Sequence, residues 1–168
     1  MLLVYPEWDP PKPVALTLNP LDLVVGRLSG NLEVQLAPHH SLGASPNAII
    51  FGLDRGGRYN LESQALGFAS HASNGFGIEL GYHYWWRWSR SLRGPFIGPS
   101  FLLGSTDHAV VGDTTDAQTY WGAALDAGGQ AVLSGGFTVG GGVGVGFLHM
   151  ADANAVFPRF LFQMGWSF

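Results

Sequence analysis

Hydrophobic and polar residues alternate one by one along most of the chain. In 75-GFGIELGYHYWWR-87 every second residue from Phe76 to Trp86 is apolar or aromatic, and most residues between them are glycine or polar. The last nine residues, 160-FLFQMGWSF-168, repeat the pattern and end on Phe168. A period of two residues is that of a β-strand, whose successive side chains point to opposite faces. The sequence therefore predicts an all-β chain.

The glycine-rich stretch 131–151 is long enough to be considered as a membrane-spanning helix. It contains seven glycines, each of which costs a helix about 1 kcal/mol relative to alanine. Its apolar residues also fall on alternate positions, so we expect strands here too. In total the pattern predicts eight strands, which cover residues 14–24, 28–37, 41–52, 75–88, 95–105, 118–133, 136–150 and 157–168.

Short turns alternate with long connections between these strands, and the longest connection is 53–74. An even number of strands of about ten residues, with short turns at one end and long connections at the other, is typical of bacterial outer-membrane barrels. We therefore expect an eight-stranded antiparallel up-and-down transmembrane β-barrel. Residues 14–168 would form it, after an N-terminal extension of residues 1–13.

The final strand and three further stretches carry a resemblance to known families. The final strand, ending on Phe168, resembles the signal that the barrel-assembly machinery reads in small eight-stranded outer-membrane barrels of Gram-negative bacteria. The stretches 18-LNPLDLVVGRLSGNLEVQL-36, 79-ELGYHYW-85 and 94-GPFIGPSF-101 resemble an outer-membrane barrel family of unassigned function. The resemblance implies a bacterial outer-membrane location, with the extension in the periplasm and with outer-membrane lipid and the assembly machinery as partners. Residues 1–13 do not show the pattern of an export signal peptide.

Composition indicates which face of the barrel meets lipid. Only 12% of the residues are charged and Lys12 is the single lysine, whereas soluble surfaces carry about 25–35% charged residues. A soluble barrel with its apolar face inside would have a surface poor in charge and rich in glycine. We expect the reverse, with the apolar face outside and polar side chains filling the narrow lumen. The net charge of −4 argues against nucleic acid as a partner, because phosphates require a basic patch.

The strand positions alternate between two faces. The polar residues at the alternate positions that face inward form the first candidate site. Buried charges are costly unless they are paired, so we expect Arg159 to meet one or more of the lumen acids. A plugged lumen would give the protein a structural role, or a binding role carried by its long connections. The alternative is a narrow gated pore for small solutes, because inward glycines at 138–146 leave room. The predicted lumen network consists of Glu33, Glu79, Arg87, Asp126, Gln130 and Arg159.

Aromatic residues near the strand ends form a second group. Amphipathic rings favour both interfaces of a membrane. We expect interface positions for Trp86, Trp88, Tyr120, Trp121, Trp166 and Phe168.

The stretch 70-SHASNGFGIE-79 raises an enzymatic alternative. Its His71, Ser73 and Asn74 resemble the active-site stretch of outer-membrane lipid A deacylases, in which a histidine and a glutamate assist a nucleophilic serine. The parity of Glu79 directs it to the lumen, however, and Ser-Asn-Gly is also a turn signal. We expect no catalytic residues, no cofactor and no metal, because the histidines are scattered and 140-GGGVGVG-146 lacks the helix and Gly-Lys-Ser/Thr of a phosphate loop.

Overall fold

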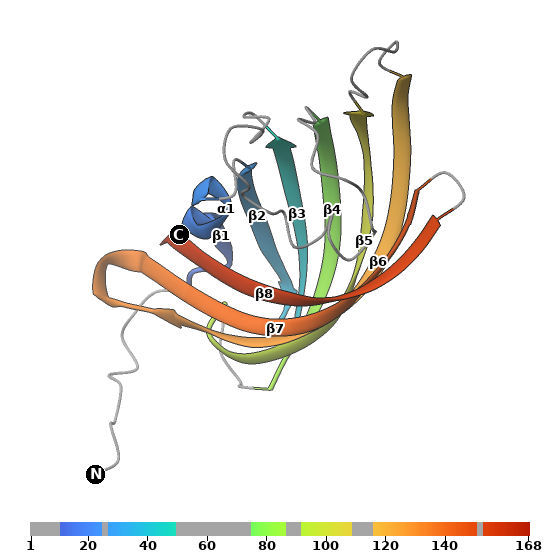
Figure 1. Cartoon of the computed structure of the whole chain (residues 1–168). Coiled ribbons are helices and arrows are strands. Elements are labelled where there is room, and N and C mark those ends of the chain that lie inside the picture. The colour runs from blue at the N-terminus through green and yellow to red at the C-terminus, as the bar shows by residue number, and fades with distance from the viewer. Residues whose placement is uncertain (1–10, 25–26, 50–74, 87–91, 109–115, 151–152) are drawn as a thin grey trace.

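Eight antiparallel strands follow one another in chain order around a closed barrel, and the last strand pairs with the first (Figure 1). This computed structural model describes residues 11–24, 27–49, 75–86, 92–108, 116–150 and 153–168. The prediction of an all-β, eight-stranded, antiparallel up-and-down barrel is confirmed. The strands are β1 (Val14–Leu18), β2 (Arg27–Ala37), β3 (His40–Ile49), β4 (Gly75–Trp85), β5 (Gly94–His108), β6 (Asp116–Val132), β7 (Phe137–Met150) and β8 (Ala153–Ser167).

The first strand is shorter than the sequence predicts. A strand was expected to run to residue 24, but β1 ends at Leu18 and a short helix, α1 (Pro20–Val24), follows it. Proline has no N–H for a strand ladder and favours the first turn of a helix. Asn19 starts that turn, since its Oδ1 accepts a hydrogen bond of 3.1 Å from the backbone N–H of Leu21. No helix within the described residues has the length and apolar character needed to cross a membrane.

Two other strand boundaries also differ from the pattern. Strand β8 begins at Ala153 rather than at residue 157, and β5 extends to His108. Between β6 and β7 the chain reverses through a 3-10 turn, η1 (Ser134–Gly136). Gly135 and Gly136 there have φ angles of 83° and 89°, which are conformations that residues with a Cβ rarely adopt.

The barrel is apolar outside and polar inside. On the outer face Phe76, Val156 and Phe160 are 70%, 69% and 68% exposed. On the inner face Thr17 and Glu33 are 0% and 1% exposed. Large apolar side chains lie exposed on all eight strands, for example Leu16, Leu32, Leu42, Phe76, Phe101, Trp121, Val143 and Phe160.

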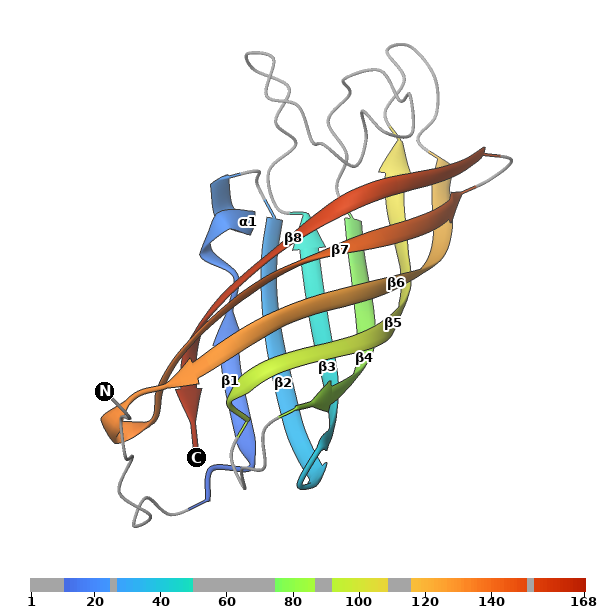
Figure 2. The same ribbon diagram turned by 90° about the horizontal axis from the view of Figure 1, so that it is seen from below.

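A buried apolar cluster lies at the end of the barrel that carries the C-terminus, the lower end in Figure 2. Ala15, Trp85, Leu92 and Phe96 pack together there, and none of them is more than 3% exposed. Gln130 holds Leu92 in place, because its Nε2 donates a hydrogen bond of 2.6 Å to the Leu92 carbonyl.

Candidate functional site: the polar lumen

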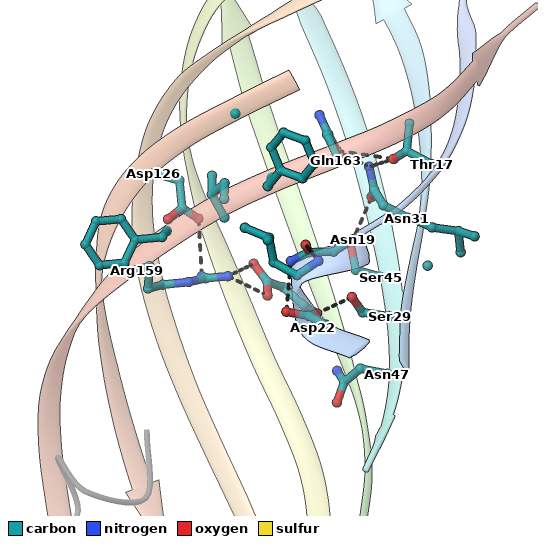
Figure 3. Close-up of a pocket in the computed structure, with 18 of the residues that line it drawn as sticks. Thr17, Asn19, Asp22, Ser29, Asn31, Ser45, Asn47, Asp126, Arg159 and Gln163 are labelled. Carbon is teal, nitrogen blue, oxygen red and sulfur yellow. Dashed lines mark hydrogen bonds and ion pairs between the residues drawn. The ribbon is translucent and has the colours of Figure 1, made fainter. Parts of the chain in front are cut away.

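Arg159 is the centre of an ion-pair network in the middle of the lumen (Figure 3). It projects from β8, and its Nη2 donates to both carboxylate oxygens of Glu79 on β4, at 2.9 and 2.8 Å. Its Nη1 donates to Asp126 Oδ2 on β6 and to Ser100 Oγ on β5, both at 3.2 Å. One guanidinium therefore joins four strands across the barrel. Arginine suits this role, because its planar fork presents several fixed donors at once.

A second network lies around Glu33 and reaches the apolar cluster through Trp85. Glu33 Oε1 accepts a hydrogen bond from Ser41 Oγ at 2.6 Å and lies 2.7 Å from His83 Nδ1. Trp85 Nε1 donates to Ser41 Oγ at 2.8 Å. Ser41 and His83 thus share one carboxylate and do not form the serine–histidine pair that a nucleophile requires. The arrangement gives hydrogen-bond partners to Glu33 Oε1, Ser41 Oγ and Trp85 Nε1.

Amides and hydroxyls form a third network. Gln163 Nε2 donates to Gln130 Oε1 at 2.7 Å, while Gln163 Oε1 accepts from Thr17 and Asn31 at 3.2 and 3.3 Å. Ser45 Oγ donates to Asn31 Oδ1 at 2.9 Å. These bonds join β1, β2, β3, β6 and β8 through neutral groups.

A cavity of about 300 Å³ lies beside the networks. Asn31, Glu79 and Arg159 line it on the barrel side. Helix α1 contributes Asp22, which accepts hydrogen bonds from Asn19 Nδ2 at 2.8 Å and from Ser29 Oγ. The lining is therefore rich in carboxylates, amides and hydroxyls.

Inward glycines make room for the large lumen side chains. A Cβ on Gly144 would overlap Asp126 Oδ1, and a Cβ on Gly146 would meet the Phe157 ring at 2.6 Å. Asp126 can therefore lie flat against β7 and still reach Arg159. Its Oδ1 is buried and has no hydrogen-bond partner among the described residues.

Gly144→Ala is expected to destabilise the barrel by about 1–3 kcal/mol, because the added methyl must displace Asp126 from Arg159. The free energy of unfolding would be measured by urea titration of tryptophan fluorescence, with the barrel refolded into lipid vesicles. Gly129→Ala is the matched control. Its Cβ would lie 3.5 Å from the nearest atom, the Gly94 carbonyl oxygen, so we expect a change of about 0.5 kcal/mol or less. Equal effects of the two substitutions would contradict the close packing of Asp126 on β7.

The structure places five of the six predicted lumen residues inside the barrel. Arg159 meets Glu79 and Asp126, whereas Glu33 and Gln130 belong to the other two networks. Arg87 lies outside the described residues, and so do Trp88 and the His71, Ser73 and Asn74 element.

Among the predicted interface aromatics, Trp86, Trp121, Trp166 and Phe168 are exposed. Their exposed fractions are 58%, 44%, 52% and 64%. The prediction for Tyr120 is wrong. Its ring lies inside the barrel over Gly77 and Gly104, where a Cβ on either glycine would overlap it. Tyr120 and Trp121 are neighbours on one strand, so only one of the two can face outward.

Several lumen residues were missing from the predicted network, namely Thr17, Asn31, Ser41, Ser45, Asn47, His83, Ser100 and Gln163. Parity could have identified most of them. His83 shares the face of Glu79, and Asn31 shares the face of Glu33. Their partners could not be read from parity, because those partners lie on strands far apart in the sequence.

Comparison with known proteins finds no matching family model, no matching curated protein and no matching solved structure. Within the described ranges, no three histidine, aspartate or glutamate side chains are grouped to hold a metal ion.

Proposed function

We propose that the protein spans the bacterial outer membrane as a small barrel with a plugged lumen, and that its role is structural or is binding through the long connections. One observation carries the proposal: the barrel is inverted relative to a soluble domain. Its exposed outer face is apolar on all eight strands, while its lumen holds Glu33, Glu79, Asp126 and Arg159.

Exposed apolar area of this extent is rare in soluble monomers, whose largest patches reach about 300–600 Å². A lipid bilayer keeps such a surface out of contact with water. A closed barrel also satisfies the other requirement of the bilayer, since it pairs strand edges that hydrocarbon could not hydrogen-bond. Outward aromatics such as Trp86 and Trp166 near the strand ends agree with an interfacial belt.

The test of membrane insertion is heat-modifiable migration. We expect the protein to remain with outer membranes until detergent extracts it, and to migrate faster on a gel before boiling than after. A compact barrel that resists dodecyl sulfate binds less of it than the unfolded chain. Recovery in the soluble fraction without detergent would overturn the proposal.

The pore alternative is tested separately. Trp85, Leu92 and Phe96 pack together in a buried cluster at the short-turn end, which favours a lumen closed to solutes. We therefore expect no conductance above background in planar lipid bilayers. Defined single-channel steps would instead support the narrow gated pore. The partners proposed with this function are outer-membrane lipid and, through β8, the barrel-assembly machinery.

A further inference from the structure

At the seam between β1 and β8 the wall of the barrel changes from two paired strands to one strand beside a short helix. Strand β1 has 5 residues and β8 has 15. Their pairing runs only from Ala15↔Ser167 to Leu18↔Met164. Beyond Leu18 the chain turns into α1, which packs against β2 and β8. A short helix therefore stands where a longer β1 would have continued the wall.

The cavity of about 300 Å³ reaches this seam. Its lining combines lumen residues, such as Asn31 and Glu79, with Leu18, Phe160 and Phe162 from the seam. On the seam side, Leu18 and Phe160 are 55% and 68% exposed on the outer face. The cavity thus has a polar side in the lumen and an apolar side at the outer surface.

The polar side contains an amide that is not used by the fold. Asn47, on β3, is only 9% exposed and lines the cavity. Figure 3 shows its carboxamide apart from the bonded groups around it, and it forms no hydrogen bond with the described residues. An amide that faces a cavity and forms no hydrogen bond with the described residues is available to a group bound there.

The charged side chains around the cavity indicate which charge a bound group would carry. The described lining of the cavity holds three carboxylates, those of Asp22, Glu79 and Asp126, and one guanidinium, that of Arg159. Among these described residues the carboxylates outnumber the guanidinium, so the lining is acidic. Glu33 Oε2 and Asp126 Oδ1 also lack hydrogen-bond partners among the described residues. A cation is favoured in this field and an anion is disfavoured.

We propose that the cavity binds a single-chain amphiphile with a protonated amine head. The ammonium lies in the lumen and donates to Asn47 Oδ1, and the alkyl chain leaves through the seam between α1 and β8, along Leu18 and Phe160. The inference rests on the proposed membrane location, because the emerging chain lies among lipid tails. Heat-modifiable migration of the same sample is checked first, so that a failure of insertion is distinguished from a failure of binding.

The test uses the full chain in lipid nanodiscs and four probes. Dodecylamine, dodecanol and dodecanoate share one chain and differ in head charge, and putrescine carries amines without a long chain. Binding is followed by the NMR shift of the Asn31 side-chain amide, which lies in the same cavity. We expect saturable shifts with dodecylamine, and at least tenfold weaker binding of the other three. Dodecanoate binding as tightly would overturn the charge argument, and putrescine binding as tightly would overturn the seam exit.

Two substitutions at Asn47 move the affinity in opposite directions. Asn47→Leu removes the acceptor at similar size, and we expect dodecylamine affinity to fall about tenfold. Asn47→Asp adds an ionic acceptor and should raise it, which keeps the test decisive if the leucine variant does not fold. Asn154→Leu is the matched control, because Asn154 is exposed and does not line the cavity. Unchanged affinity in both Asn47 variants would refute the assigned head-group site.

Discussion

Arg159→Met is expected to destabilise the barrel by about 3–5 kcal/mol, since it leaves the carboxylates of Glu79 and Asp126 in the lumen without their cation. The two acids lie on β4 and β6, and Arg159 on β8 is the residue that joins them. Their side chains are 16% and 3% exposed, so water can offset little of the lost pairing. The free energy of unfolding would be measured by urea titration in lipid vesicles.

A neutral network provides the control for this prediction. Arg159→Met combined with Glu79→Gln and Asp126→Asn removes both the cation and the two charges that need it. We expect this triple variant to recover most of the stability, because the loss in the single variant comes from uncompensated charge. Arg159→Lys should fall between them, since an ammonium lacks the planar fork that reaches both acids. If Arg159→Met is as stable as the wild type, the ion pairs do not hold the strands together.

Phe160→Arg is the substitution that tests the orientation of the barrel in a bilayer. Phe160 lies at the middle of β8, opposite Val143 of β7, and is 68% exposed. At the midplane of a membrane an outward arginine costs a barrel about 2–4 kcal/mol. On a water-facing surface the same change would alter stability by about 0.5 kcal/mol or less. The readout is again the free energy of unfolding in lipid vesicles.

Leu36→Arg is the depth control for that experiment. Leu36 is 63% exposed and lies one residue from the end of β2, beside a short turn. An arginine near the interface costs about 0–1 kcal/mol. A similar cost at both positions would contradict a bilayer centred on the middle of β8.

Parity accounts for how much of the fold could be predicted from the sequence. Alternation identifies strands and assigns each side chain to a face, and this was enough to place Glu33, Glu79, Asp126 and Arg159 on the inner face. It also made the barrel, rather than an open sheet, the expected arrangement, because both strand edges must be paired in lipid.

Two predictions were wrong, one for the end of the first strand and one for the face of Tyr120. The segment after Leu18 contains apolar residues on strand-like spacing, but Asn19 and Pro20 start a helix there. Tyr120 was assigned by residue type, although the parity of Trp121 had already turned it inward. After Leu18 the local backbone chemistry overrides the alternation, whereas at Tyr120 the alternation overrides the interface preference of tyrosine.

The candidate site needed three-dimensional information. The pairing of Arg159 with Glu79 joins residues 80 positions apart, and nothing in the spacing of strands fixes which inward layers coincide across a barrel. The cavity was equally hidden, because it depends on the early end of β1 and on the position of α1. The alternation places Asn47 on the inner face, but nothing else in the sequence identifies it as part of a site.

The inward glycines of β7 have a consequence for strand register. Gly140, Gly142, Gly144 and Gly146 occupy four successive inward positions, so a slip of β7 by two residues would still leave a glycine at three of the four. The information that selects one alignment must therefore lie at the two ends of the run. There Thr138 bonds Ser167 at 2.7 Å, and Leu148 is buried in the lumen. These two residues, together with the tight turn η1, therefore favour the native alignment of β7 over a slipped one.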